Sequence, residues 1–466
     1  MEHKSKRSNF TGQIGFVLAA AGSAVGLGNI WRFPYLAAKD GGGVFLLCYI
    51  VLALTFGFTL LTTEIAIGRK TRQSPLTAYK VIHPKWGFIG IFACLVPTLI
   101  LPYYCTIGGW VLKYLMTFVS GQGMAAAQDG YFSNYISSMP EPLIWMAVYI
   151  LITAFVVYCG VDKGIEKYSK ILMPILLVLI MGISFFSLTL SHTDAAGVTR
   201  TGLQGLKIYL IPDFTGMTIG RFMVILMDAM GQLFYSISVA MGIMIAYGSY
   251  AKKETNLMNS INQIEFFDTL VAVLAGLMIV PAVYTFMGVE GMGAGPGLMF
   301  VSLPKVFEAM GSIGTLIGMM FFVMVSFAAI TSSVSIMEAI VSSIMDRFHI
   351  SRKKSTVFVT VYALIVGAIV CLGYNIFYFE YTLPNGTVAQ ILDIMDYISN
   401  SCLMPLVAVS TCILIGWVVK PQVVIDEVTQ GGAKFQRKRL YVAMIKFIAP
   451  ILLCLLLLLS LGLIRL

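Results

Sequence analysis

Charged residues are scarce in this chain of 466 residues, at 11%, whereas 58% of the residues are hydrophobic and the mean hydropathy is +0.87. One soluble core cannot hide that much apolar surface, so the composition excludes a soluble globular protein. The four histidines lie in termini and loops, and the eight cysteines fall almost all within apolar runs without zinc-type spacing. These absences count against metal-cluster chemistry, redox chemistry and a histidine proton relay.

Long apolar runs are abundant instead. Eleven of them reach the roughly 20 residues that are needed to cross about 30 Å of hydrocarbon, so we expect an all-α polytopic membrane protein. The runs lie near residues 11–37, 41–67, 87–112, 143–160, 171–190, 222–248, 264–288, 312–341, 355–378, 397–419 and 440–464. The charged first ten residues enter the first run without a small-residue cleavage site, which predicts no cleaved signal peptide.

Lysine and arginine gather in alternate connecting segments, and this bias predicts the orientation. The rich segments are 4–7, 69–85, 163–170, 252–253, 347–354 and 420–439. They predict a cytoplasmic N-terminus and, after eleven spans, an outer C-terminus. The net charge of +9 is then an orientation signal and an affinity for anionic lipid headgroups, since the basic residues are too dispersed for a nucleic-acid surface.

Two apolar runs carry helix-weakening residues at their centres. The first contains Gly22, Gly26 and Gly28, and the sixth contains Gly231-Gln232-Leu233-Phe234-Tyr235-Ser236-Ile237-Ser238-Val239-Ala240-Met241-Gly242. Irregular backbone at membrane depth is tolerated only where it is buried in protein or lines a cavity, so we expect a polar ligand there. In the sixth run, small residues for close helix packing are the alternative. The two positions are equivalent if spans one to five and six to ten are repeats.

Ionisable residues inside spans usually face an interior cavity, and here these are Arg32, Glu64, Asp268, Asp393 and Asp396. The eighth span adds hydroxyls at residues 331–333 and 335. Such hydroxyls can simply bond to helix carbonyls. They also suit a sodium site, because Na⁺ is a hard cation that prefers oxygen ligands.

Several motifs together resemble the neurotransmitter:sodium symporter family, in its bacterial eleven-span amino-acid transporter branch. They are Asn29-Ile30-Trp31-Arg32-Phe33-Pro34, Asp40-Gly41-Gly42-Gly43-Val44-Phe45, Glu64-Ile65-Ala66-Ile67-Gly68-Arg69, the segment 232–242 and Thr331-Ser332-Ser333. The resemblance runs from about residue 7 to residue 415 and implies a five-plus-five inverted repeat in one membrane domain. The repeats would cover 10–190 and 220–419, with the eleventh span at 439–466. Most of the family have a twelfth span, whereas eleven are expected for the sequence of this chain.

The resemblance also implies a set of binding residues. One sodium site would use the Ala24 carbonyl, Asn29, Ser236 and Asp268, and a second would use carbonyls of Gly22, Val25 and Ala328 with the hydroxyls of Thr331 and Ser332. A substrate carboxylate would meet N–H groups near Leu27 and Gly28 and the hydroxyl of Tyr104, and its ammonium would meet carbonyls near Ser23, Tyr235, Ser236 and Ser238. Ala24 would also contact the substrate, and the remaining pocket would be lined by Ile100, Tyr104, Tyr235, Met241, Ser332 and Ile336.

Two positions narrow the expected activity. Monoamine-transporting members have an aspartate where this chain has Gly26, so the substrate here is expected to bring its own carboxylate. The apolar lining and the deformable Met241 favour hydrophobic or aromatic L-amino acids. Animal members have asparagine where this chain has Asp268, and its carboxylate predicts transport with sodium but without chloride.

The resemblance further implies two gates. Arg32 and Asp396 would form the outer gate with Tyr235 beneath as a lid, and a static ion pair is the alternative. Arg7 and Asp346 would close the inner path near Tyr250 and Phe10. Glu64 is expected to brace the broken sixth span.

Other functions stay open at this point: a transporter of another small zwitterion, or a sodium channel, although a channel would need a continuous polar pore. A membrane enzyme would need a nucleophile with a base or a metal triad, which the sequence does not offer. We expect a bacterial inner-membrane location, while the preferred amino acid and the oligomeric state stay open.

Overall fold

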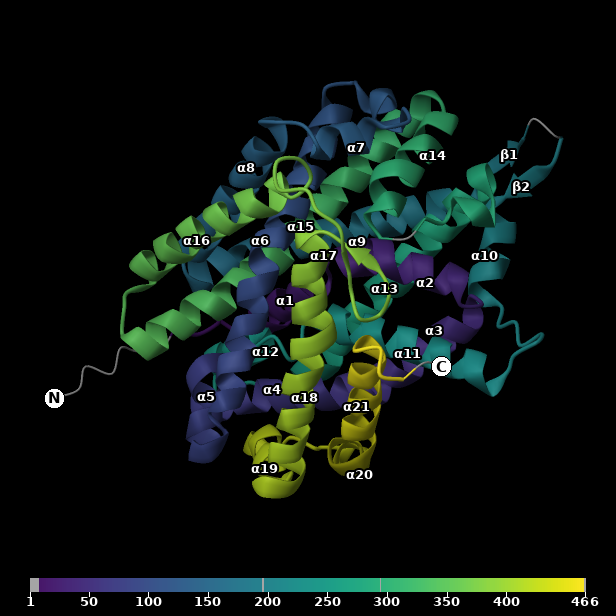
Figure 1. The fold of residues 1–466 in the computed structure, drawn as a ribbon. Coiled ribbons are helices and arrows are strands. Elements are labelled where there is room, and N and C mark those ends of the chain that lie inside the picture. Colours follow the sequence, from purple (N-terminus) through teal and green to yellow (C-terminus); the bar gives the residue numbers. More distant parts are fainter. Residues whose placement is uncertain (1–7, 195–196, 294, 465–466) are drawn as a thin grey trace.

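Helices make up most of the computed structural model, which describes residues 8–194, 197–293 and 295–464 (Figure 1). Within these ranges, nine helical stretches are long and apolar enough to cross a membrane. They are Gly43–Thr71, Pro84–Val119, Glu141–Tyr158, Val161–Leu188, Leu257–Met287, Ser312–Phe348, Arg352–Leu372, Ile391–Val418 and Lys438–Ser460.

The two weakened runs are broken, as the sequence predicts. The first comprises α1 (Gln13–Ala24) and, after a bend of 54°, the π-helical turn η1 (Gly28–Arg32) with α2 (Phe33–Lys39). In the sixth position, α11 (Ile219–Ser236) and α12 (Ile243–Tyr250) are separated by residues 237–242. The predicted total of eleven spans counts this pair as one crossing, and it stays a prediction.

The nine continuous stretches are each built from one or several helical segments. These are α3 (Gly43–Leu52), η2 (Ala53–Gly57) and α4 (Phe58–Thr71); η3 (Pro84–Trp86) and α6 (Phe88–Val119); α8 (Glu141–Tyr158); η5 (Val161–Glu166) and α9 (Lys167–Leu188); α13 (Leu257–Met287); α15 (Ser312–Phe348); α16 (Arg352–Leu372); α17 (Ile391–Asp396), η8 (Tyr397–Leu403), α18 (Met404–Ile413) and η9 (Leu414–Val418); α20 (Lys438–Ala443), η11 (Met444–Ile448) and α21 (Ala449–Ser460).

Short elements connect these stretches. They are α5 (Pro75–Ile82), η4 (Gly123–Ala127), α7 (Tyr131–Ile136), α10 (Gly202–Leu210), η6 (Val289–Gly291), η7 (Leu298–Ser302), α14 (Leu303–Ala309), α19 (Gln422–Val428), η10 (Gln430–Gly432), and two antiparallel hairpins, β1 (Ser191–Thr193) with β2 (Thr199–Thr201) and β3 (Tyr381–Thr382) with β4 (Val388–Ala389).

Several helices extend past the limits that the apolar runs predict. The eighth run was expected to end at residue 341, but α15 continues to Phe348, and the fifth was expected to begin at 171, but η5 begins at Val161. Hydropathy follows only the stretch that fits the hydrocarbon, whereas a helix continues until its backbone groups meet another partner or water. The helical stretches therefore continue about two turns past the predicted end of the eighth run and begin about three turns before the predicted start of the fifth.

The helices form a core that surrounds α1. This helix packs against α9, α13 and α15, while α6 lies along α15 and α12 lies along α4 (Figure 1). The stretches that bury least are Val161–Leu188 and Lys438–Ser460, so these two present most of their surface to the lipid. The broken helices are thus enclosed by others, where irregular backbone can be satisfied by protein.

Ion pairs tie the two broken helices together beyond their breaks. Arg221 in α11 contacts the Asp40 carboxylate at 3.1 Å and the Lys39 carbonyl at 2.9 Å, and Lys39 pairs with Asp228 at 3.0 Å. Asp40 lies between α2 and α3, and its burial, together with the nearby Asp228 carboxylate, raises its pKa to about 6. These contacts make α2 and α11 one unit at this end of the molecule.

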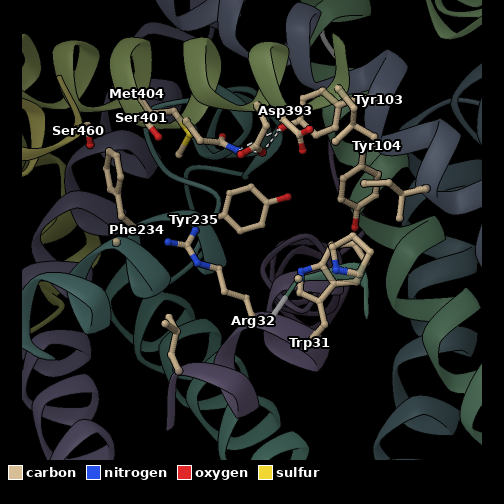
Figure 2. A pocket seen from close by; sticks show the side chains of 18 of the residues that line it. Trp31, Arg32, Tyr103, Tyr104, Phe234, Tyr235, Asp393, Ser401, Met404 and Ser460 are labelled. Atoms are coloured by element: carbon tan, nitrogen blue, oxygen red, sulfur yellow. Dashed lines mark hydrogen bonds between the residues drawn. The ribbon is translucent and has the colours of Figure 1, made fainter. Parts of the chain in front are cut away.

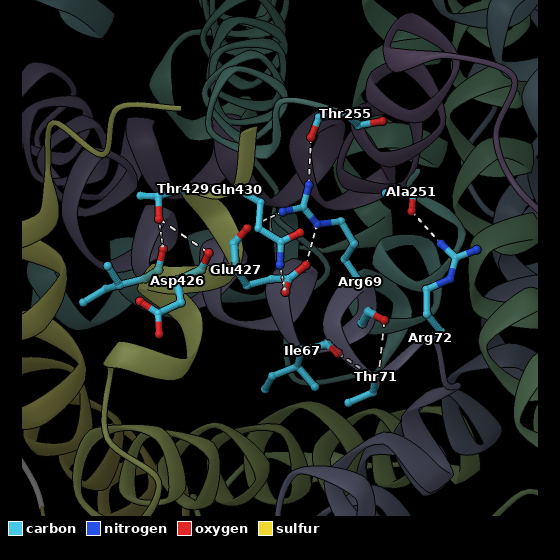
Figure 3. A network of polar contacts seen from close by, with 12 residues as sticks. Ile67, Arg69, Thr71, Arg72, Ala251, Thr255, Asp426, Glu427, Thr429 and Gln430 are labelled. Atoms are coloured by element: carbon cyan, nitrogen blue, oxygen red, sulfur yellow. Dashed lines mark hydrogen bonds and ion pairs between the residues drawn. The ribbon is translucent and has the colours of Figure 1, made fainter. Parts of the chain in front are cut away.

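A second buried network lies at the opposite end, between α4 and α19 (Figure 3). Arg69 donates from Nε to the Glu427 carboxylate at 2.7 Å, from Nη2 to the Glu427 carbonyl, and from Nη1 to the Thr255 carbonyl at 2.8 Å. Both charged side chains are almost fully buried, at 1% and 4% exposure. The pair therefore fixes the segment after η9 against the end of α4.

Replacing Glu427 by alanine would leave the Arg69 charge buried and uncompensated. We expect the free energy of unfolding to fall by about 3–5 kcal/mol, because a half-removed buried pair keeps its desolvation cost. Denaturant titration of the purified protein in detergent measures this change. Gln430→Ala is the matched control, because it removes one hydrogen bond to the same carboxylate and should cost about 1 kcal/mol. Equal losses in the two variants would contradict this account of the pair.

Candidate functional site

The site begins where the two helix breaks meet. α1 ends at Ala24, and Val25 adopts an extended conformation, with φ −76° and ψ 91°. In the second break, Ser238, Ala240 and Gly242 all have positive φ, at 55°, 62° and 73°. Non-glycine residues rarely adopt this conformation, so contacts from the surrounding protein must hold it.

Serines join the two breaks to each other and to α15. Ser238 donates its hydroxyl to the Ser23 carbonyl at 3.0 Å, and the hydroxyls of Ser23 and Ser335 lie 2.6 Å apart. Ser332 donates to the carbonyls of Ser23 and Val25 at 3.2 and 3.4 Å. Carbonyls that the broken helix leaves free are thereby satisfied from outside the helix.

Glu64 supports the second break, as the sequence predicts. Its Oε1 accepts a hydrogen bond from the Ala240 N–H at 2.6 Å, and the side chain is 3% exposed. Ala240 is one of the positive-φ residues, so this contact fixes the backbone where it is least favourable. The bracing interpretation of Glu64 is confirmed.

A cavity of about 20 Å³ lies between the breaks. All twelve residues predicted to bind substrate line it, and Gly26 and Asn29 join them. The lining is Ser23, Ala24, Gly26, Leu27, Gly28, Asn29, Ile100, Tyr104, Tyr235, Ser236, Ser238, Met241, Ser332 and Ile336. One face of the cavity is polar backbone and hydroxyl, and the other is aliphatic and aromatic.

Two of the residues predicted for the first sodium site, Asn29 and Ser236, contact a third, Asp268, and the fourth, Ala24, lines the small cavity with Asn29 and Ser236. Asp268 Oδ1 accepts hydrogen bonds from Asn29 Nδ2 at 3.0 Å and Ser236 Oγ at 2.6 Å. The Tyr49 hydroxyl donates to Oδ2 at 3.3 Å. Sequence reasoning missed Tyr49, whose only signal is a hydroxyl within an apolar run.

The five residues of the second predicted site lie where α1 ends beside α15. Thr331 donates its hydroxyl to the Ala328 carbonyl at 3.0 Å, and Ser332 reaches the Val25 carbonyl. A Cβ atom on Gly22 would lie 3.3 Å from the Thr331 Cβ, so this glycine allows the two helices to approach closely. The Thr331 bond lies within α15, as expected for a hydroxyl that bonds to helix carbonyls, whereas the Ser332 bond joins α15 to the end of α1.

A larger cavity of about 440 Å³ lies next to the small one (Figure 2). Tyr104 and Tyr235 are the two residues that line both cavities, so their side chains separate them. Trp31, Tyr103 and Phe234 add further aromatic walls to the larger cavity. This arrangement puts Tyr235 where the sequence predicts a lid.

The predicted outer-gate residues, Arg32 and Asp396, both line the larger cavity. Both are described residues, and no ion pair forms between them. Asp396 instead accepts hydrogen bonds from Tyr103 at 3.0 Å and Asn400 at 2.6 Å, and Arg32 and Tyr235 both line the cavity (Figure 2). In this conformation the larger cavity is not closed by that pair.

The opposite side of the site is closed by an aromatic cluster. Phe10 packs against Phe16, Tyr247 and Tyr250, with ring centroids 5.6, 5.7 and 6.2 Å apart. Its predicted neighbour Arg7 lies outside the described residues, and Asp346 accepts a hydrogen bond from the Ser74 N–H at 2.6 Å. The Arg7–Asp346 gate therefore stays a prediction.

A further buried pair lies at this side and was missed by sequence reasoning. Glu338 in α15 receives hydrogen bonds from Arg352 at 2.5 Å and from the Tyr250 hydroxyl at 2.5 Å. Its signal was a carboxylate within an apolar run, only a few residues before the charged segment 346–354. The pair joins α12, α15 and α16.

A sequence model of the Sodium:neurotransmitter symporter family matches residues 7–129 and 130–465, so the chain belongs to this family. An uncharacterized sodium-dependent transporter of Bacillus subtilis, YhdH, is 34% identical, with 96% of each chain covered. The human sodium- and chloride-dependent GABA transporter 2 is 26% identical over 89% of this chain and 73% of its own length. A crystal structure of MhsT in complex with L-phenylalanine superposes with a TM-score of 0.85 at 32% identity, covering 97% of this chain and all of that one.

Family membership defines the class of this protein. It is a sodium-dependent symporter that crosses the membrane several times, and it is a transporter rather than an enzyme.

Removing the Glu64 carboxylate tests the geometry of the second break. Glu64→Ala leaves the buried Ala240 N–H without an acceptor, so we expect the free energy of unfolding to fall by about 1–3 kcal/mol. Glu64→Gln keeps a carbonyl acceptor at the same place and should retain most of the stability. Thermal and denaturant unfolding in detergent measure both variants, and an unchanged Glu64→Ala protein would show that the contact does not stabilise the break.

Proposed function

We propose that this protein imports hydrophobic or aromatic L-amino acids together with two sodium ions, without chloride, by alternating access. The proposal includes the predicted orientation, with the N-terminus in the cytoplasm and the C-terminus outside, in a bacterial inner membrane. It also includes the two five-span repeats, with the two breaks at equivalent positions.

The observation that carries the proposal is the space around Gly26. A Cβ atom at this position would lie 2.9 Å from Ser332 Oγ and 3.4 Å from the Tyr104 hydroxyl. A side chain at this position would have to displace the Ser332 hydroxyl, and glycine supplies no carboxylate here, so the substrate must supply the anionic group itself. The Tyr104 hydroxyl is buried and makes no hydrogen bond to a described residue, so it is free to donate to such a group.

The remaining lining favours an apolar side chain. Ile100, Met241 and Ile336 border the small cavity together with the rings of Tyr104 and Tyr235. Methionine repacks easily, so Met241 can yield as the cavity enlarges around a bound side chain. The complex of MhsT with L-phenylalanine, at 32% identity, supports the same substrate class.

Charge balance supports the sodium stoichiometry. One sodium ion would lie among the Ala24 carbonyl, Asn29, Ser236 and Asp268, with the substrate carboxylate completing its shell. The second would lie among the carbonyls of Gly22, Val25 and Ala328 and the hydroxyls of Thr331 and Ser332. In a low-dielectric site two cations need nearby negative charge. The substrate carboxylate and Asp268 place two negative charges beside the two ions, and carbonyls of the broken helices would stabilise the substrate ammonium, so we assign no role to chloride.

Alternating access would use the two sides of the site in turn. The larger cavity gives an outer route past Tyr235, and Arg32 would approach Asp396 when that route closes. On the inner side, the Phe10 cluster and the Glu338 network hold the path shut in this conformation. The two tied helices α2 and α11 would move together, because their ion pairs join them.

Uptake of labelled amino acids into proteoliposomes tests the proposal. All twenty L-amino acids and GABA are compared, with and without an inward sodium gradient. We expect saturable, concentrative uptake of hydrophobic or aromatic amino acids that collapses without the gradient. Preferred uptake of GABA would assign another small zwitterion, and flux that does not saturate would indicate a channel.

Chloride should be dispensable. Replacing chloride by gluconate at constant sodium is expected to leave the initial uptake rate unchanged, because Asp268 already supplies the negative charge. Loss of uptake in gluconate would contradict this role of Asp268.

Asp268→Asn should weaken sodium binding. Removing one charge from a buried site is expected to raise the sodium concentration for half-maximal uptake by at least tenfold, or ~1.4 kcal/mol. Asp213→Asn, in an exposed loop, is the control that removes the same charge at a distance from the site. Identical sodium curves for the two variants would count against the first sodium site.

A further inference from the structure

A lysine lies inside the last membrane stretch. Lys446 belongs to the π-helical turn η11, eight residues after the stretch begins at Lys438, which is about 12 Å along a helix. A charged side chain at such depth is costly and normally has a partner. Among the ion pairs between described residues, none includes Lys446.

An aromatic side chain takes the place of an acidic partner. The Lys446 ammonium lies 5.7 Å from the centre of the Trp417 ring, at the end of the neighbouring stretch. The Trp417 Nε1–H donates to the Lys446 carbonyl at 3.0 Å, and the Phe447 ring meets Trp417 edge-on at 5.4 Å. These three residues, which we term the Trp417 platform, are held by two helices rather than by a loop.

The backbone is shaped to bring the platform together. Trp417 lies in η9 and Lys446 in η11, so both helices have a π-helical turn at the contact, a feature that often marks functional positions. A Cβ atom on Gly416 would lie 3.0 Å from the Ile445 carbonyl oxygen, so the glycine permits the close approach.

The platform faces outward. Trp417 is 56% exposed and Phe447 is 52% exposed, and Phe447 belongs to Lys438–Ser460, one of the two stretches that bury least. A cation over an aromatic ring, beside apolar surface, matches a ligand that carries both an anionic group and hydrocarbon chains. A small anion from water would bind the ammonium without making apolar contact with the exposed rings.

The surrounding charge is mostly positive. Exposed Lys420 and Lys434 lie between the two stretches, and exposed Lys438 and Arg439 begin the last one. The exposed acid in this segment, Asp426, accepts a hydrogen bond from Gln422. The buried acid, Glu427, is already paired with Arg69, and Arg437 is paired with Glu265. Basic residues next to a span attract the anionic headgroups of the cytoplasmic leaflet.

We propose that the Trp417 platform is a binding site for the headgroup of an anionic phospholipid in the cytoplasmic leaflet. The Lys446 ammonium meets the phosphate, and the rings of Trp417 and Phe447 lie along the glycerol and the first part of the acyl chains. The assignment to the cytoplasmic leaflet rests on the orientation given in the proposed function, whereas the preference for an anionic headgroup does not depend on it.

Native mass spectrometry of the purified protein tests the site without a transport substrate. Dioleoylphosphatidylglycerol and dioleoylphosphatidylcholine are titrated against the wild type, Lys446→Gln, Lys446→Arg and Lys353→Gln. Lys353 is the matched control, because its ammonium lies 5.4 Å from the Tyr158 ring but at the beginning of α16, outside the platform. A parallel titration with inorganic phosphate separates a lipid from a free anion.

We expect tighter binding of phosphatidylglycerol than of phosphatidylcholine by the wild type. Lys446→Gln should weaken phosphatidylglycerol binding about fivefold, the share of one basic side chain near a membrane surface, and leave phosphatidylcholine binding unchanged. Lys446→Arg and Lys353→Gln should retain the preference. The site would be overturned if the wild type bound both lipids with equal affinity, or if Lys446→Gln left phosphatidylglycerol binding unchanged. It would also be overturned if Lys353→Gln weakened phosphatidylglycerol binding as much as Lys446→Gln, or if millimolar phosphate displaced the lipid.

Two measurements separate this proposal from the proposed function. Trp417→Leu removes the ring but keeps the charge, and it should lower phosphatidylglycerol binding while the protein still unfolds cooperatively. Labelling of a cysteine introduced at Lys354 from each side of the membrane reports the orientation. If phosphatidylglycerol binding depends on Lys446 but position 354 is labelled from outside, the assignment to the cytoplasmic leaflet and the proposed orientation are both refuted. The preference of the Trp417 platform for anionic headgroups would remain.

Discussion

A membrane protein cannot leave backbone polar groups unpaired in hydrocarbon, and the structure of this symporter depends on that constraint. Two of its helices are interrupted, after Ala24 and after Ser236, and both interruptions are enclosed by other helices. The freed carbonyls and N–H groups are met by serine hydroxyls and by the Glu64 carboxylate. The same groups that would be a liability toward lipid become a polar surface inside the protein.

The enclosed breaks account for the arrangement around them. Asp268 brings Asn29 and Ser236 together from the two broken helices, and Tyr104 and Tyr235 separate the small cavity from the larger one. Ion pairs at one end join α2 to α11, and buried pairs at the other end join α4, α12, α15, α16 and α19. These contacts join the helices around the site into groups.

The positions of the two helix breaks could be predicted because each break has a local sequence pattern. Glycines and hydroxyls at the centre of an apolar run identify both breaks. The resemblance to a family predicted twelve of the residues that line the small cavity. The missed features depend on packing between distant segments: Tyr49 with Asp268, and Glu338 with Tyr250 and Arg352. No local pattern pairs residues so far apart. Helix ends such as Phe348 were missed because hydropathy follows the part of a helix that lies in the hydrocarbon and gives no information on where the helix ends beyond it.

The central claim is that the two breaks form one site in which sodium and an amino acid bind together. Equilibrium binding of labelled L-phenylalanine to the purified protein, measured over a range of sodium concentrations in potassium-balanced buffer, tests it most directly. The account predicts saturable binding that requires sodium, rises with a Hill coefficient above one, and is unaffected when chloride is replaced. Binding that persists at the same affinity in potassium alone would contradict the claim.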